Sequence, residues 1–175
     1  EIDSIVARVP NGPQTALCSA TMPAETRGLA ERHLYDPVTV KVKAATLTID
    51  TVEQFYLETK PADKVASLVR VLEAERPTQA IVFARTKIRT EQLYRTLRDK
   101  GMNVKALHGD MSQGSRDGVM ISFKSGRVPI LVATDVAARG LDIASVTHIV
   151  NFHVPTSPDA YVHRSGRTGR VGRSG

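Results

Sequence analysis

Cysteine is almost absent from this sequence, and long apolar runs are absent altogether. The single Cys18 among 175 residues cannot form an internal disulfide, and no paired cysteine or histidine spacing predicts a zinc site. No run approaches the roughly 20 apolar residues that a membrane-spanning helix needs, and no charged-then-apolar leader opens the chain. We therefore expect a cytoplasmic protein without a structural metal.

A phosphate-binding loop of the pattern G-x-x-x-x-G-K-[ST] is also missing. Enzymes that hydrolyse nucleoside triphosphates commonly use such a loop to cradle the phosphates. We therefore expect the chain alone not to turn over ATP. The sequence has no initiator methionine and stops at Gly175 within a Gly/Arg/Ser stretch. We expect it to be a piece of a longer protein.

Basic residues outnumber acidic ones, which gives a formal net charge of +6 and weakly favours polyanionic partners. The distribution is more informative: from His163 to Gly175 there are four arginines and no acidic residue. That stretch predicts either a local positive field or a solvated tail. With 41% hydrophobic residues, the chain can form one domain with a core.

Apolar residues alternate between strand-like and helical spacing from Val52 onward. Strands are predicted at 52–57, 79–84, 104–107, 130–133 and 146–151. Helices are predicted around 65–72 behind Pro61, around 88–97 before Gly101, around 119–123, and at 157–164. This order predicts an α/β fold with a doubly wound, largely parallel sheet.

The first 42 residues carry a separate pattern. Two strand-like stretches, Thr15–Cys18 and 38–42, lie on either side of a helical pattern from Ala24 to Leu34. Residues 43–51 have no long apolar face, so we predict a linker there.

Polar residues follow three of the predicted strands, at the edge where parallel sheets bind ligands. They are Arg85-Thr86, His108-Gly109-Asp110 and Thr134-Asp135. On the residues alone, Asp135 is better explained as a helix cap or a salt-bridge partner than as a catalytic acid, because no second carboxylate or ligand histidine is spaced around it, and the helix cap is the favoured explanation. His108 is explained as well by packing as by catalysis.

Two further segments could bind phosphate. The segment H-R-S-G-R-T-G-R at 163–170 combines arginine forks that grip phosphate oxygens with glycines that let the backbone approach, or it is a flexible basic tail. Gln113 and Arg116 lie one turn apart at the start of a predicted helix, where anions are favoured. An ordinary solvated helix face is the alternative for that pair.

Taken in order, these segments resemble the motifs of the second RecA-like domain of DEAD-box RNA helicases. The matching segments are S-A-T at 19–21, I-V-F-A-R-T at 81–86, Q-G-S-R at 113–116, A-T-D-V-A-A-R-G-L-D at 133–142 and H-R-S-G-R-T-G-R at 163–170. They follow the family's order and spacing across essentially the whole chain. The last motif opens with His163, where DEAH-type helicases usually carry glutamine, which favours the DEAD-box branch. The residues of the motifs are typical of bacterial members.

The resemblance implies a RecA-like fold, with helices on both faces of its sheet, in a two-lobed enzyme. Residues 1–42 would be the end of the first lobe, 43–51 a linker, and 52–175 the second lobe, truncated at its carboxyl end. ATP with Mg²⁺ would bind between the lobes, with the metal held mainly by the missing first lobe. Single-stranded or duplex RNA would lie across both lobes.

The resemblance also implies roles for single residues. Arg167 and Arg170 would be arginine fingers that reach the γ-phosphate, and Asp142 and Gly140 would bind the nucleotide, with Asp142 at the ribose. The residues implied to hold RNA phosphates and ribose hydroxyls are Arg85, Thr86, Gly109, Gln113, Arg116, Thr134 and Arg139.

Contacts with the first lobe are implied at two places. His163 and Arg164 would connect to the carboxylate motif of that lobe and to the S-A-T segment. Ser19 and Thr21 of that segment would couple the two lobes. The family usually continues with another strand and helix after Gly175, so we expect an exposed sheet edge and self-association of the isolated chain.

Two alternatives stay open. A DNA translocase or repair helicase would share the arginine fingers, although usually not this combination of motifs. A non-catalytic RNA-binding scaffold would keep the fold without the chemistry, and intact arginine fingers argue against it.

Overall fold

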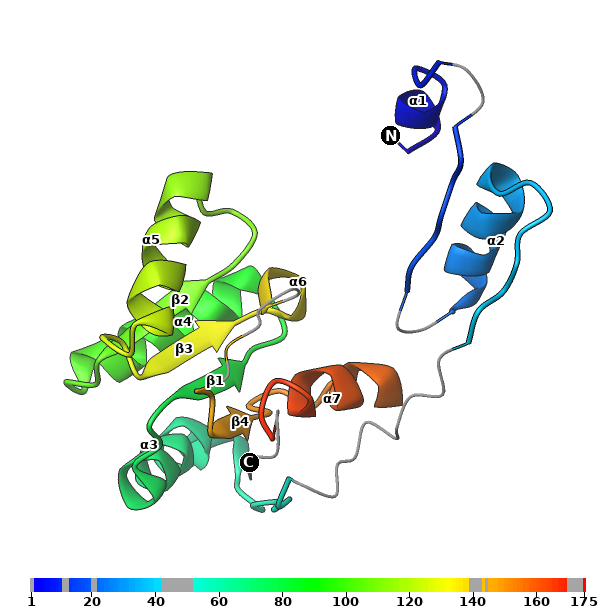
Figure 1. The fold of residues 1–175 in the computed structure, drawn as a ribbon. Helices are drawn as coiled ribbons and strands as arrows, with labels where there is room; N and C mark the ends of the chain where they lie inside the picture. The colour runs from blue at the N-terminus through cyan, green and yellow to red at the C-terminus, as the bar shows by residue number, and fades with distance from the viewer. Residues whose placement is uncertain are drawn as a thin grey trace. The chain divides into compact units, whose positions relative to one another are not determined.

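The structure is a computed structural model that describes residues 2–10, 13–19, 22–41, 52–138, 143, 145–169 and 175 (Figure 1). Its internal contacts divide the chain into two units, Glu1–Lys43 and Ala44–Gly175. Among the described residues, no helix has the length and apolarity needed to cross a membrane.

The first unit contains two helices, α1 (Ile2–Val6) and α2 (Ala24–His33), and no residue of either is buried. The predicted helix from Ala24 is confirmed. Asp3 and His33 join the two helices, with Oδ1 and Nε2 2.8 Å apart.

The two strands predicted in the first unit are wrong. Residues 15–18, and the described part of 38–42, belong to no strand. A strand exists only where a neighbouring backbone completes its ladder of hydrogen bonds, and the paired strands of the described chain all lie in the second unit.

The second unit is built on a parallel sheet in the order β2-β3-β1-β4. Its strands are β1 (Ala80–Phe83), β2 (Val104–Leu107), β3 (Ile130–Ala133) and β4 (His148–Val150). Every residue of β1 and β3 is buried, as expected for central parallel strands that are covered on both faces. The edge strand β2 exposes Lys105, a charge that discourages pairing with another chain.

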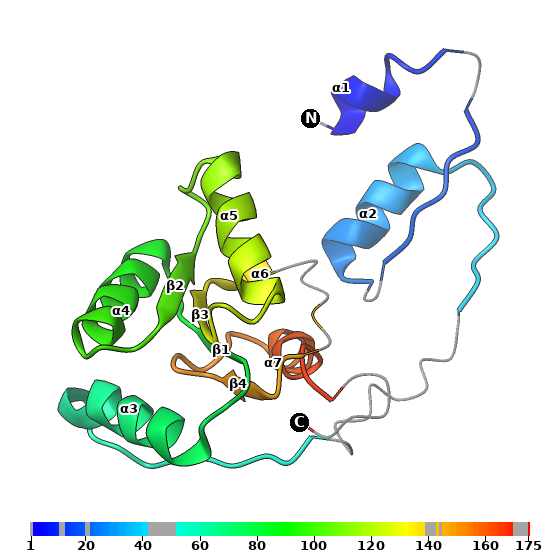
Figure 2. The ribbon, with the colours of Figure 1, turned by 60° about the vertical axis from the view of Figure 1, so that its left-hand side comes forward.

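Helices cover both faces of this sheet, which confirms the predicted fold class (Figure 2). They are α3 (Lys64–Glu75, after the 3-10 turn Pro61–Asp63), α4 (Lys87–Asp99), α5 (Gln113–Lys124), α6 (Asp135–Ala138) and α7 (Pro158–Ser165). Leucines of α3 and α4 form one core cluster with Ala80 and Val82. The other cluster packs Phe123 of α5 against Ile81 and Phe83.

Short polar residues cap three helices of the second unit, and a glycine ends one of them. The side chains of Thr86, Ser112 and Ser157 each accept a hydrogen bond from a backbone N–H in the first turn of α4, α5 and α7. Gly101 has a φ of +82° after α4, as its predicted role at that helix end requires.

The strand predicted at 52–57 is also wrong. The segment is extended without a ladder, and its large apolar side chains face solvent: Phe55 is 84% exposed and Tyr56 is 89% exposed. One backbone bond reaches it, from Glu53 N–H to the carbonyl of Gly175 at 2.8 Å. The Tyr161 hydroxyl of α7 also donates to Gln54 Oε1.

Candidate functional site

The four parallel strands end at one edge of the sheet, and polar residues gather there. Arg85 and Thr86 follow β1, Gly109 follows β2 and Thr134 follows β3. The topology therefore brings these four predicted RNA-contacting residues to a common edge, as the strand-end rule expects.

Arg164 of α7 is buried beneath this edge, with 3% of its surface exposed. Its Nε and Nη2 donate to the two carboxylate oxygens of Asp135 at 2.5 and 2.8 Å. Its Nη1 donates to Asn151 Oδ1 at 2.9 Å and to the carbonyl of His153 at 2.7 Å. The guanidinium carbon lies 4.8 Å from the ring centroid of Phe83. Arg164 thus ties α7 to β1, to the end of β4 and to α6.

This bidentate geometry explains why Arg164 can be buried. A buried charge is tolerated when a partner of opposite charge and further hydrogen bonds satisfy it. The arrangement fixes α7, which carries the first three residues of the H-R-S-G-R-T-G-R segment, against the carboxyl edge of the sheet. The contact with the first lobe that the resemblance implies for Arg164 stays a prediction.

The helix-cap explanation of Asp135 is wrong. Asp135 is the first residue of α6 and pairs with Arg164, whereas the cap comes from the residue before it. Thr134 Oγ1 accepts a hydrogen bond from the backbone N–H of Ala137 at 3.4 Å. The alternative of a salt-bridge partner is the one that holds, and the sequence did not identify Arg164 as that partner because it lies in a distant segment.

Arg85 and Thr86 connect β1 to α4 and are both exposed. Thr86 Oγ1 accepts from the N–H of Arg89 at 3.2 Å, and its carbonyl accepts from the hydroxyl of the buried Thr90 at 2.9 Å. The backbone of this connection is therefore fixed from inside α4, while the Arg85 side chain reaches solvent.

Gln113 and Arg116 occupy the first turn of α5. Gln113 Nε2 donates to Asp117 Oδ1 at 2.8 Å, so the glutamine is held by its own helix. Arg116 is half-buried, and its backbone N–H donates to the carbonyl of Ser112 at 3.0 Å. Their predicted contact with phosphate is compatible with this placement and stays a prediction.

The remaining predicted residues differ in how far the structure describes them. His163 and Ser19 are exposed, and Arg167 is half-buried with its N–H donating to the carbonyl of Arg164 at 3.0 Å. Predictions also fall on Thr21, Arg139, Gly140, Asp142 and Arg170, which lie outside the described residues.

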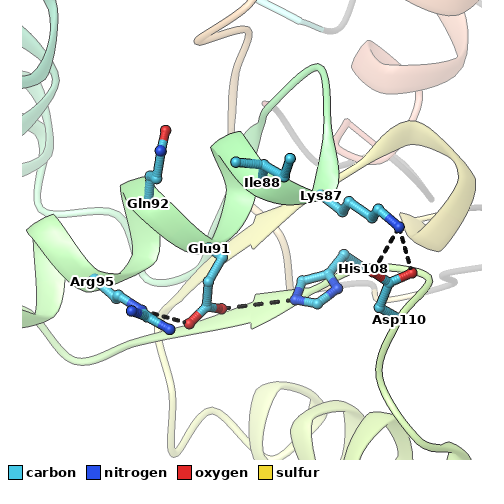
Figure 3. A pocket seen from close by; sticks show the side chains of 7 residues that line it. All are labelled: Lys87, Ile88, Glu91, Gln92, Arg95, His108 and Asp110. Atoms are coloured by element: carbon cyan, nitrogen blue, oxygen red, sulfur yellow. Dashed lines mark hydrogen bonds and ion pairs between the residues drawn. The ribbon is translucent and has the colours of Figure 1, made fainter.

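A shallow groove runs between α4 and the connection that follows β2 (Figure 3). Lys87 Nζ contacts Asp110 Oδ2 at 2.7 Å, which ties the loop around Gly109 to the start of α4. Glu91 contacts both Arg95 at 2.8 Å and His108 at 3.7 Å. These pairs favour the packing explanation of His108, and they stiffen the loop that carries Gly109.

Sequence reasoning missed two polar residues at this edge, Asn151 and His153, although both directly follow β4. The rule used for the other strands would have found them. The Arg85 backbone N–H donates to His153 Nδ1 at 3.4 Å, and the His153 N–H donates to the carbonyl of Phe83 at 3.1 Å. Desolvation and four neighbouring cations lower the pKa of His153 below its ordinary value of 6.5.

Comparison with known proteins identifies this architecture. The model of the helicase conserved C-terminal domain matches residues 63–172. The chain therefore belongs to the family of helicase conserved C-terminal domains. Within that class, the resemblance to bacterial DEAD-box RNA helicases is confirmed by the relatives and solved structures below.

Two curated relatives are DEAD-box ATP-dependent RNA helicases named CshA. The one from Bacillus subtilis (strain 168) is 49% identical over 175 residues, covering 100% of this chain and 35% of the relative. The one from Geobacillus kaustophilus (strain HTA426) is also 49% identical, covering 100% of this chain and 38% of the relative. The chain thus spans little more than a third of the length of these relatives.

Solved structures of DEAD-box proteins share the fold. Dbp5 of S. cerevisiae bound to RNA and ADP BeF3 is 34% identical with a TM-score of 0.78, over 90% of this chain and 42% of that one. A DEAD box protein from the hyperthermophile Methanococcus jannaschii is 36% identical with a TM-score of 0.67, over 99% of this chain and 47% of that one. These similarities confirm the RecA-like fold.

Proposed function

We propose that this chain supplies the carboxy-terminal motor lobe of an ATP-dependent RNA helicase, which couples ATP binding and hydrolysis to local unwinding of RNA duplexes. The observation that carries the proposal is the buried Arg164. It holds α7 against the same strand ends that present Arg85, Gly109 and Thr134. The names of the similar proteins, and the RNA in the Dbp5 complex, support the same activity.

The proposed chemistry is attack of water on the γ-phosphorus of ATP. The bond to the bridging oxygen of ADP breaks, and ADP and inorganic phosphate leave. Arg167 and Arg170 would stabilise the charge on the transferring phosphoryl group, and such fingers contribute on the order of a thousandfold or more in rate. Arg167 directly follows the helix that Arg164 fixes, so its backbone starts from a rigid base.

The nucleotide would be shared between two lobes. Within the described ranges, no three His, Cys, Asp or Glu side chains are grouped so that they could hold a metal ion, and the Asp135 carboxylate is already bound by Arg164. Following the resemblance, we assign Mg²⁺ mainly to the first lobe and derive no step from it. Asp142 and Gly140 of this chain would bind the ATP itself.

On the RNA side, the proposed contacts are to phosphates and ribose hydroxyls. They are assigned to Arg85, Thr86, Gly109, Gln113, Arg116, Thr134 and Arg139. Such contacts carry little sequence information, which suits an enzyme that acts on many duplexes. Contacts to the 2′-hydroxyl would favour RNA over DNA.

Communication between the lobes is assigned to three residues. His163, exposed on α7, would contact the first lobe, and Ser19 and Thr21 would couple nucleotide binding to RNA binding. Arg164 is assigned a positioning role, because its guanidinium is engaged within its own lobe. A cytoplasmic location stays a prediction.

We also propose that the isolated chain self-associates through the apolar segment 52–57. Phe55, Tyr56 and Leu57 are 84%, 89% and 62% exposed. Burying such side chains against a second copy would remove apolar surface from water. The segment is also extended, so it could pair with the same segment of another chain.

The function is tested by ATP hydrolysis in a protein that joins this chain to its first RecA-like lobe. Hydrolysis is measured without nucleic acid, with single-stranded RNA and with DNA of the same sequence. Stimulation by RNA alone is the expected result. Equal stimulation by DNA would instead indicate a DNA translocase, and RNA binding without any hydrolysis would indicate a binding scaffold.

A further inference from the structure

Four cations from four different parts of the second unit act on the imidazole of His153. The side chains that act on its imidazole electrostatically are Lys64, Arg85, Arg89 and Arg164. Lys64 begins α3, Arg85 follows β1, Arg89 lies in the first turn of α4, and Arg164 belongs to α7. The imidazole is half-buried among them, at the carboxyl edge of the sheet.

Only one of these four cations has its charge balanced in the part of the chain that the structure describes. Arg164 pairs with Asp135. Lys64, Arg85 and Arg89 form no ion pair with a described carboxylate: the Lys64 ammonium lies 4.9 Å from the ring centroid of Phe152, and Arg89 Nη1 donates to the neutral Gln92 amide oxygen at 3.0 Å. Among the described residues, three positive charges near His153 are therefore left without a paired carboxylate.

The geometry around His153 also favours a neutral imidazole. Its Nδ1 accepts the N–H of Arg85, so that nitrogen carries no proton. Desolvation and the four cations lower its pKa, so the histidine does not add a fourth uncompensated charge at neutral pH. The start of α4, capped by Thr86, adds the partial positive charge of a helix amino terminus beside Arg89.

We propose that Lys64, Arg85 and Arg89, gathered around His153, form a site for one phosphate of a nucleic-acid strand, and that this site carries the RNA path from β1 onto α3. This inference rests on the proposed function and deepens it. A phosphate would supply the missing negative charge, and the arginine forks can grip its oxygens in two places. Lys64 would contribute a point charge from its place over the ring of Phe152.

A strand phosphate fits this site better than the phosphates of a bound nucleotide. Arg85 is shared with the residues assigned to RNA. It follows β1, which lies between β4, whose end is followed by the Phe152 that Lys64 contacts, and β3, beyond which β2 precedes Gly109. The arginine fingers that would grip ATP follow α7 instead. As a backbone contact, the site would strengthen binding without selecting a sequence.

The site is tested by NMR of the 175-residue chain, with the His153 side-chain resonance identified by its loss in His153→Asn. A single-stranded decauridylate RNA is the probe, and inorganic phosphate at the same phosphate concentration is the comparison. A bound strand phosphate offsets the neighbouring cations, so the RNA should raise the pKa of His153. The resonance of His148, at the opposite end of β4, should not move.

Matched variants distinguish binding at a specific site from non-specific attraction of RNA to the positive charge of the chain. Lys64→Gln should reduce the effect of RNA on His153 and make the log–log salt slope of RNA binding shallower by about 0.7, the value for one phosphate on a single strand. Lys124→Gln, which removes an exposed charge at the end of α5, should match the unsubstituted chain. Lys64→Arg should restore binding, which excludes a folding defect as the cause.

Three results would overturn the site. Inorganic phosphate that acts on His153 as strongly as the RNA would indicate a free-anion site only. RNA that shifts resonances near Gly109 and Arg116 but leaves His153 and the Lys64→Gln affinity unchanged would reject the site while the proposed function stands. Absence of RNA binding in the chain and in the protein with both lobes would reject the proposed function as well.

Discussion

The two units of the chain differ in what their helices pack against. No residue of α1 or α2 is buried, although α2 is ten residues long. In the second unit, Leu68, Leu93 and Phe123 are almost fully buried, because each helix lies on a sheet whose central strands are buried throughout. The comparison teaches that burial here follows from a completed sheet rather than from helix length.

The same contrast separates the residues that could do chemistry. Those with a fixed local geometry, such as Arg164, Asp135 and Thr134, lie at the edge of the completed sheet. Ser19, in the first unit, is exposed. A rigid edge is what preorganised phosphate contacts require, so the second unit is where the candidate site can be built.

The largest expected effect comes from removing the buried anchor. Arg164→Leu leaves Asp135 without its cation and leaves Asn151 and the His153 carbonyl without donors. Removing one partner of a buried ion pair costs about 3–5 kcal/mol, and the 40% exposure of the Asp135 side chain places this case near 3 kcal/mol. Urea unfolding followed by far-UV circular dichroism measures the loss.

A matched surface arginine is the control for that experiment. Arg95→Leu breaks the exposed i,i+4 pair with Glu91 and should cost about 0.5 kcal/mol or less. If both variants lost the same free energy of unfolding, the contrast between a buried edge and an open surface would fail.

A smaller effect is expected at the exposed segment 52–57. Phe55→Lys should leave the free energy of unfolding nearly unchanged, because the side chain has little packing to lose, while it weakens self-association of the chain. Sedimentation equilibrium measures the association. Val154→Lys, at another exposed apolar residue, should leave it unchanged. A stability loss typical of a core residue in Phe55→Lys would show that the segment is packed.

The smallest expected effect is on pH dependence. The pKa of His153 is lowered from 6.5 in the folded chain. Just below pH 6.5, the imidazole therefore binds a proton in the unfolded chain but stays neutral in the folded chain. Stability should therefore fall as the pH drops from 6.5 to the folded-state pKa. His153→Asn should lose less stability over that window. If the free energy of unfolding of the two proteins changed in parallel with pH, His153 would not be the cause of the pH dependence.

The sheet of the second unit and the helices packed on it could be predicted from the sequence. The apolar runs around β1, β2 and β3 and the helical spacing of α3 to α5 were sufficient, because local pattern and tertiary packing agree there. The segments 15–18 and 52–57 have a similar strand pattern, yet no strand of the described ranges pairs with them. Alternation of apolar and polar residues shows which face of a segment can be buried. Whether the segment becomes a strand depends on a neighbouring strand, which the pattern does not identify.

The sequence predicted where the candidate site lies better than it predicted which side chains contact one another there. Strand ends located Arg85, Thr86 and Thr134, since parallel strands share one carboxyl edge. The pairing of Arg164 with Asp135, 29 residues apart, could not be read from either segment. His153 was overlooked because its cationic neighbours come from separate elements that only the fold assembles.

The central claim is that the segment after α7 supplies the cations for phosphoryl transfer. The most direct test measures ATP hydrolysis with saturating single-stranded RNA in the protein that joins both lobes, comparing Arg167→Ala and Arg170→Ala with the unsubstituted protein. The account predicts a loss on the order of a thousandfold in each variant, with RNA binding and unfolding unchanged. Near-normal turnover in both variants would contradict it.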